Sequence, residues 1–76
     1  MYETFVLINC DLGKEEQIVK SLQEIEYVKE VQATHGVYDV VAKLETKTEK
    51  ELTEIVRQKI LGLEQVHSVL TLFAVI

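Results

Sequence analysis

The sequence has few cysteines and few basic residues, and it has no long apolar run. Its single cysteine, Cys10, excludes an internal disulfide and suits a reducing compartment. Eight basic residues stand against thirteen acidic ones, and the formal net charge of -5 argues against direct binding to a nucleic-acid backbone. No window approaches the roughly twenty apolar residues needed to span a bilayer. We therefore expect a soluble, cytoplasmic protein that does not bind a membrane.

A single domain of 76 residues has a marginal core, because a chain of this size buries only about 60% of its unfolded surface. Such domains gain stability from disulfides, metals or oligomerisation. One cysteine cannot form the paired-cysteine loop of a metal carrier, and His35 and His67 are too far apart in sequence to form a local ligand pair. The three glycines lie in separate loops, which excludes a glycine-rich phosphate cradle. We expect no cofactor, and we expect oligomerisation.

Apolar patterning predicts six elements in the order βαββαβ. Short runs of bulky or alternating apolar residues predict strands at residues 4–8, 28–35, 39–45 and 66–76. Stripes at helical spacing predict two helices, the first from Lys14 with Ile18, Val19, Leu22 and Ile25, the second with Leu52, Ile55, Val56 and Ile60. Thr48 and Glu51 form a capping box at the start of the second helix, and Gly62 ends it.

A weak internal repeat supports this order. The segment Ile25-Glu26-x-Val28-x-x-Val31 matches Leu63-Glu64-x-Val66-x-x-Val69 at an offset of 38 residues, and each copy links a helix end to the following strand. Two βα units with right-handed crossovers, related by a pseudo-twofold axis, give a ferredoxin-like βαββαβ sandwich. This α+β fold has an antiparallel four-stranded sheet with two helices on one face.

The other face of such a sheet is open, and a monomer should make it polar. The first strand instead offers Phe5 and Leu7 on one side and Val6 and Ile8 on the other, so one of these pairs must be buried by another copy of the chain. Val41 and one set of apolar residues from the last strand add to the same patch. The pattern predicts a homodimer that forms through the open sheet face.

The segment Gly36-Val37-Tyr38-Asp39, between the second and third strands, indicates a ligand site. Glycine adopts positive φ without steric cost, so the chain can reverse there and leave backbone N–H groups pointing outward. These amides could hold the carboxylate of a small zwitterion while Asp39 holds its ammonium group. The alternative is a tight hairpin turn without a ligand, because glycine and aspartate are common turn residues.

The run Val31-Gln32-Ala33-Thr34-His35-Gly36-Val37-Tyr38-Asp39-Val40-Val41, followed by the capped helix, resembles the effector-binding (RAM) domain of Lrp/AsnC-type transcriptional regulators. A G-x-Y-D turn is the usual signature of that domain, and the similarity covers nearly the whole chain. The resemblance implies a domain that dimerises through its sheets, assembles into a ring of dimers and binds an amino acid effector between dimers. The ligand contacts that it implies are Thr34, Gly36, Val37, Tyr38 and Asp39, with Thr71 on the last strand completing the pocket.

Full-length members of that family carry an N-terminal helix-turn-helix, whereas the first predicted strand here begins within a few residues of Met1. We therefore expect residues 1–76 to form one stand-alone ligand-binding domain, which regulates transcription by co-assembly with full-length regulators. Two alternatives remain: a small dimeric ferredoxin-like enzyme with a pocket on the open face, and a pure assembly scaffold. The polar groups available to such an enzyme, Asn9, His35 and Lys43, include no base with an orienting partner, so we expect no enzyme.

Overall fold

The computed structural model describes residues 2–73, and it confirms the predicted order of strands and helices. The strands are β1 (Tyr2–Cys10), β2 (Val28–Ala33), β3 (Val40–Thr46) and β4 (Val66–Phe73). The helices are α1 (Glu15–Gln23) and α2 (Glu49–Ile55), and α2 continues into a π-helical turn, η1 (Val56–Ile60). The last three residues of the strand expected to end at residue 76 lie outside the described residues.

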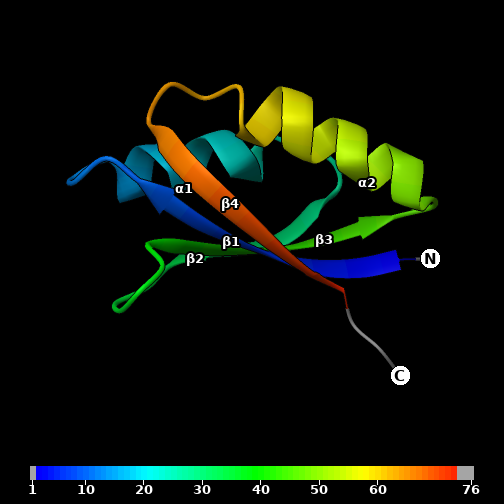
Figure 1. Cartoon of the computed structure of the whole chain (residues 1–76), viewed down its shortest axis with the longest axis horizontal. Helices are drawn as coiled ribbons and strands as arrows, with labels where there is room; N and C mark the ends of the chain where they lie inside the picture. Colours follow the sequence, from blue (N-terminus) through cyan, green and yellow to red (C-terminus); the bar gives the residue numbers. More distant parts are fainter. Residues whose placement is uncertain (1, 74–76) are drawn as a thin grey trace.

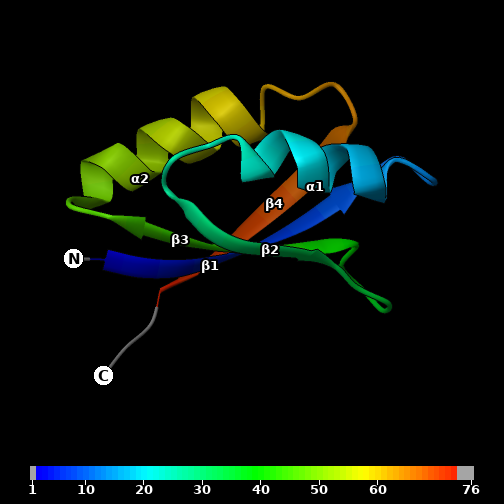
Figure 2. The same ribbon diagram turned by 180° about the vertical axis from the view of Figure 1, so that it is seen from behind.

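The four strands form one antiparallel sheet in the order β2-β3-β1-β4. Both helices lie on one side of this sheet, as the two opposite views show (Figures 1 and 2). This arrangement is the predicted ferredoxin-like sandwich. Within residues 2–73, no helix is both long enough and apolar enough to cross a membrane.

The predicted internal repeat is visible in the backbone hydrogen bonds that link each helix to the next strand. In the first unit, the N–H groups of Ile25 and Val28 each donate to the carbonyl three residues earlier, at 3.0 Å. In the second unit, Leu63 and Val66 make the same two bonds at 3.1 Å. The two βα units therefore close with the same local geometry.

The hydrophobic core lies between the sheet and the helices. In β3, buried and half-buried residues alternate, as predicted, so that Val40, Ala42 and Leu44 face the helices. β1 directs Val6 and Ile8 to the same side. The helices complete the core with Ile18, Leu22, Leu52, Ile55 and Ile60.

The opposite face of the sheet carries an apolar patch, which we call the open-face patch: Phe5, Leu7, Val41, Leu70 and Leu72. β1 and β4 place these side chains next to one another, because Leu7 pairs with Leu70 and Phe5 pairs with Leu72. Leu70 is 44% exposed and Leu72 is 47% exposed in the single chain. Of the two alternatives on β1, Phe5 and Leu7 are therefore the pair left uncovered by the helices.

Several backbone features were not predicted. The pairing of β2 with β3 shifts register between Val28 and Glu30, the pairing of β1 with β4 shifts between Asn9 and Cys10, and β2 ends at Ala33 instead of reaching His35. At the end of η1, the N–H of Leu61 donates to the carbonyl of Val56, five residues earlier, at 2.8 Å.

The beginning of α2 is fixed by the predicted cap. The N–H of Glu51 donates to the Thr48 hydroxyl at 3.1 Å, and the Glu51 carboxylate accepts from the N–H of Lys47 at 3.1 Å. The same carboxylate accepts from the Tyr27 hydroxyl at 3.3 Å, and its negative charge is the main cause that raises the pKa of Tyr27. Glu51 therefore joins the cap of α2 to the loop that precedes β2.

Thr48→Ala removes the cap and should lower the free energy of unfolding by about 1 kcal/mol. Thr53→Ala is the matched control, because Thr53 is exposed, its hydroxyl donates within residues 2–73 to the carbonyl of Glu49 alone, and alanine favours helix. Urea unfolding at one fixed protein concentration measures the free energy of unfolding of both variants. Equal losses in the two variants would show that the cap does not contribute.

Candidate functional site

The six residues 34–39 connect β2 to β3, and we call them the β2–β3 turn. The turn projects from one end of the molecule, at the lower left of Figure 1. Gly36 has φ +134°, a conformation that residues with a side chain rarely adopt, and a Cβ added there would meet nothing within 4 Å. Glycine is therefore required here by backbone conformation and not by lack of space. Beside it, Val37 is 82% exposed.

Hydrogen bonds close the base of the turn and leave its tip open. The N–H of Thr34 donates to the carbonyl of Asp39 at 2.9 Å, and the Thr34 hydroxyl donates to the carbonyl of Tyr38 at 2.6 Å. Among residues 2–73, no acceptor is found for the N–H groups of Gly36, Val37 and Tyr38. The tip thus presents backbone donors to its surroundings.

Asp39 connects the turn to the end of β1. Its N–H donates to the carbonyl of Ile8 at 2.9 Å, and its Oδ2 accepts from the N–H of Cys10 at 2.9 Å. Asp39 was predicted from the sequence as a ligand contact, and this second role was not predicted. The two partners are 29 residues apart in the chain, so no local pattern could have indicated the bond.

Cys10 is buried at this junction and is the one free cysteine of the chain. Burial is the main cause that raises the pKa of its thiol, followed by the negative charges of Asp39, Glu15 and Asp11. The thiol therefore stays protonated at neutral pH and is a poor nucleophile or metal ligand. Its backbone, which donates to Asp39, contributes to the candidate site, whereas its sulfur does not.

The two histidines belong to different parts of the structure. His67 pairs with the carboxylate of Asp11, and the N–H of Asp11 donates to the carbonyl of Gln65 at 2.8 Å, so this contact ties the loop after β1 to the beginning of β4. His35 lies in the β2–β3 turn. No group of three or more histidine, cysteine or acidic side chains in residues 2–73 is arranged to hold a metal ion.

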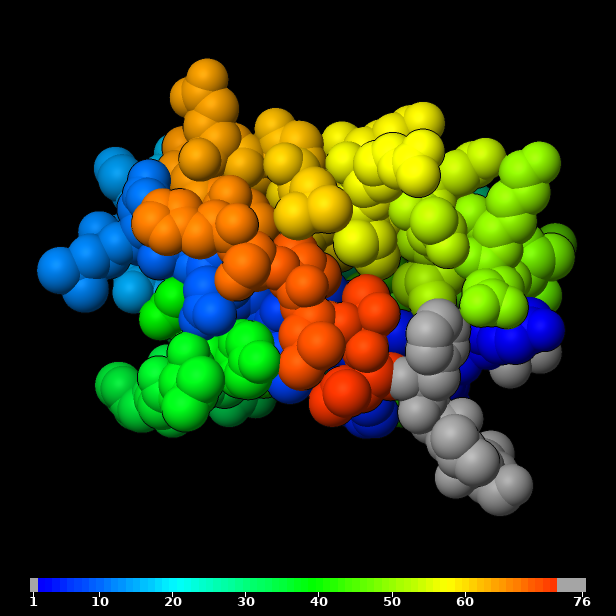
Figure 3. All heavy atoms as spheres, in the orientation of Figure 1, coloured from blue at the N-terminus to red at the C-terminus, as the bar shows by residue number. Residues whose placement is uncertain are grey.

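Thr71 lies far from the β2–β3 turn within one chain. It pairs with Val6, on the side of β4 that faces the helices, and β4 is the edge strand opposite to β2. There it lines a cavity of about 230 Å³, which we call the α2–β4 hollow, together with Leu52, Thr53, Val56, Arg57 and Leu61. In the space-filling view, β4 in orange and red lies against α2 and η1 in yellow (Figure 3). The single chain therefore does not bring Thr71 together with the other predicted ligand contacts.

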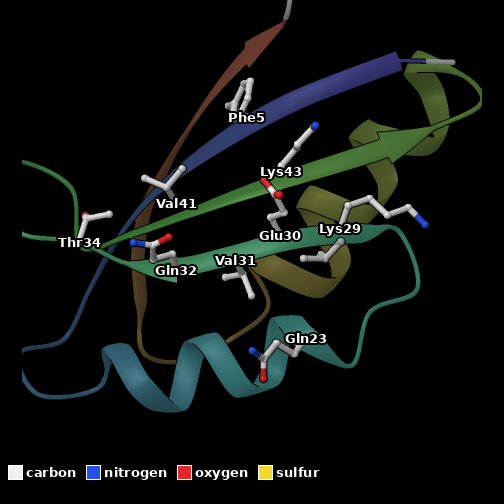
Figure 4. A pocket seen from close by; sticks show the side chains of 10 residues that line it. Phe5, Gln23, Lys29, Glu30, Val31, Gln32, Thr34, Val41 and Lys43 are labelled. Carbon is white, nitrogen blue, oxygen red and sulfur yellow. The ribbon is translucent and has the colours of Figure 1, made fainter.

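A wider groove of about 720 Å³ lies along β2 and β3 and reaches the open-face patch at Phe5 and Val41. Figure 4 shows these two side chains with Lys43, Glu30 and Gln32. Of the predicted ligand contacts, Thr34 alone is among its lining residues. The groove mixes charged and apolar groups on the face where we expect a second copy of the chain.

The three polar groups considered for an enzyme are not brought together. The Asn9 amide donates to the Ser68 hydroxyl at 3.3 Å, and Lys43 forms an ion pair with Glu3 at 3.7 Å. Lys43 pairs with Phe5, four residues from Asn9 along β1, and His35 lies in the turn beyond the end of β2. These positions form no group of a base and an orienting partner.

Comparisons with known proteins give one consistent result. Residues 3–75 match the sequence model of the family described as Lrp/AsnC ligand binding domain. The HTH-type transcriptional regulator FL11 of Pyrococcus abyssi is 36% identical over 70 residues, which cover 90% of this chain and 46% of FL11. The chain thus spans about half the length of the curated relatives that it matches.

Solved structures share the fold. The protein TTHA0845 from Thermus thermophilus is 36% identical, with a TM-score of 0.93 and coverage of 99% of this chain and 94% of that chain. AsnC of Escherichia coli has a TM-score of 0.90 at 20% identity and matches 96% of this chain with 50% of its own. At that identity, the likeness to AsnC concerns the fold alone.

The hydrogen bond between Asp39 and Cys10 predicts a difference between two substitutions. Asp39→Ala leaves the N–H of Cys10 without its acceptor and should lower the free energy of unfolding by about 1–3 kcal/mol. Asp39→Asn keeps an acceptor oxygen and should lower the free energy of unfolding clearly less than Asp39→Ala does. Urea unfolding of the two variants and the unsubstituted protein measures the difference. Equal costs would mean that the hydrogen bond does not stabilise the junction.

Proposed function

Because the chain belongs to the family of Lrp/AsnC ligand-binding domains, we propose that it is an oligomeric regulatory module that binds an amino acid at the β2–β3 turn. The observation that carries the proposal is the open tip of this turn. Among residues 2–73 the N–H groups of Gly36, Val37 and Tyr38 have no acceptor, and Asp39 follows them in the chain with its carboxylate held by the N–H of Cys10. Adjacent donors and a carboxylate complement the two charged groups of an amino acid.

Each group of the turn has a defined part in this proposal. The N–H groups of Gly36 and Val37 donate to the ligand carboxylate, in the way that backbone nests hold anions. Asp39 uses Oδ2 for the N–H of Cys10, and its second oxygen receives the ligand ammonium. Thr34 and Tyr38, joined through the Thr34 hydroxyl, hold the turn in shape and line the same end.

The positions of the turn and of Thr71 favour a ligand site shared between subunits. They lie at opposite edge strands of the sheet, so one ligand can contact both only if the turn of one subunit faces the α2–β4 hollow of another. Such a contact joins two different surfaces, and repetition of it gives a ring when the rotation between successive subunits closes. This geometry supports the proposed ring of dimers with the amino acid between them.

The open-face patch supports the dimer within that ring. It joins apolar side chains of β1, β3 and β4 into one surface that the helices do not cover. Patches of this kind mark interaction surfaces. Since full-length regulators of the family contain the same domain, the same face also suits co-assembly with them, through which the module would act on transcription.

The first experiment is a thermal-shift screen against the twenty amino acids. We expect selective stabilisation by one amino acid or a small chemical group of them, with about 2.7 kcal/mol gained when the ligand is at 100 times its Kd. Asp39→Asn should abolish the shift, because the amide keeps the bond to Cys10 but loses the charge for the ligand ammonium. Glu24→Gln, which removes one charge from an exposed site beyond α1, is the control and should keep the shift. A protein that no amino acid stabilises would favour the scaffold alternative.

The second experiment tests the open face. Leu70→Lys places a charge in the patch at a residue that the single chain leaves 44% exposed, so the subunit should fold while its dimer dissociates. Light scattering should show a lower mass than for Leu12→Lys, a control at a residue that is 96% exposed in the loop after β1. An unchanged mass for Leu70→Lys would place the dimer contact elsewhere.

A further inference from the structure

We infer that His67 and Asp11 position Asp39 in the β2–β3 turn, through a contact between the His67 and Asp11 side chains that strengthens when His67 is protonated. Asp39 is the residue to which the proposed function assigns the ligand ammonium group. The inference rests on the proposed function where it concerns ligand binding, whereas the positioning of Asp39 can be measured without a ligand. It makes His67, a residue of β4, a positioning residue for a turn on the other side of β1.

A β-bulge at the beginning of β4 places His67 for this contact. The pairing of β1 with β4 shifts register between Asn9 and Cys10. Cys10 then pairs with Val66, and the pairing passes over His67. In an unbroken register His67 would oppose Cys10 and share its buried side of the sheet. The bulge instead packs Val66 against the core and leaves the His67 side chain 61% exposed, in contact with the carboxylate of Asp11.

Cys10 and Asp11 hold the two sides of the end of β1. Successive N–H groups of a strand point to opposite edges, and here one points to the turn and the next to β4. The N–H of Cys10 donates to Oδ2 of Asp39 at 2.9 Å. The N–H of Asp11 donates to the carbonyl of Gln65 at 2.8 Å, and the Asp11 carboxylate contacts His67. Two contacts therefore hold Asp11 against β4, and the residue before it presents its N–H to Asp39.

The contact with His67 acts on a segment that is otherwise open to solvent. Asp11 begins the loop after β1, in which Leu12 is 96% exposed and Gly13 has a positive φ. In Figure 3, the blue atoms at the end of β1 lie against the orange atoms at the beginning of β4. The His67 and Asp11 side chains are both more than a third exposed, so their contact should change local opening by about fivefold at most and should not change the fold.

Histidine is the residue type that changes charge between about pH 5.5 and about pH 8. A carboxylate attracts a protonated imidazole more strongly than a neutral one, so the contact tightens as the pH falls and loosens as it rises. Within residues 2–73, Asp11 alone lies within ion-pair distance of His67. The other ionisable side chains of the surrounding segments are Lys14 and Glu15 after β1, His35 and Asp39 in the turn, and Glu64 before β4.

Hydrogen exchange of the Cys10 amide, followed by NMR, tests the positioning without a ligand. Between about pH 5.5 and about pH 8, its protection should fall by up to about fivefold relative to that of the Ala42 amide in the centre of the sheet. His67→Gln removes the charge and should lose this pH dependence. His67→Arg is charged at every pH and should keep the protection high throughout. His35→Gln is the matched control, because it removes the other histidine of the chain and should keep the pH dependence.

Asp11→Asn removes the other half of the contact and should match His67→Gln. The two substitutions together should lose no more protection of the Cys10 amide than either does alone, because both remove the same interaction. Fully additive losses would overturn the inference, since the two side chains would then act separately. A pH dependence that is absent in the unsubstituted protein, or that survives in His67→Gln, would overturn it as well.

The amino acid that gives the largest shift in the thermal screen separates this inference from the proposed function. Its Kd should be up to about fivefold lower at about pH 5.5 than at about pH 8, and His67→Arg should remove the difference. If the Cys10 amide follows His67 but no amino acid stabilises the protein, the positioning of Asp39 stands and the proposed function is wrong. If an amino acid binds equally well at both pH values, the proposed function stands and the inference is wrong.

Discussion

The rest of this structure depends on one constraint: a central strand is apolar on both faces, whereas helices cover only one face of the sheet. β1 lies between β3 and β4 and sends Val6 and Ile8 into the core, while Phe5 and Leu7 face away from the helices. Among residues 2–73 no further element covers that second face, and an apolar patch of this kind suits contact with another molecule. β1 therefore contributes residues both to the core and to the surface where we propose assembly.

The end of β1 also sets the position of the candidate site. The N–H of Cys10 holds the carboxylate of Asp39, and the carbonyl of Ile8 accepts from the backbone of the same residue. The turn, which would otherwise be an exposed loop, is thus anchored to a central strand of the sheet. Such anchoring preorganises backbone donors, which reduces the entropy lost when a ligand binds.

Much of the fold could be predicted from sequence because its signals are local. The alternation in β3, the apolar stripe of α1 and the capping pair Thr48 and Glu51 each lie within a few residues. The features that were missed depend on distant or backbone partners: the register shift after Val28, the π-helical turn and the bond between Asp39 and Cys10. The order of the strands in the sheet determines which face of β1 stays open and where Thr71 lies relative to the turn. No short segment encodes that order.

The separation of the turn from Thr71 has a thermodynamic consequence for the proposed regulator. If the amino acid contacts the turn of one subunit and the hollow of the next, it binds the assembled form more tightly than a free dimer. By linkage, the ligand must then favour assembly by the same free energy with which assembly favours the ligand. A ligand that bound the two forms equally would change nothing, however tight its binding. Sensing by this fold would therefore require no movement within a subunit, because the two halves of the site meet only when subunits do.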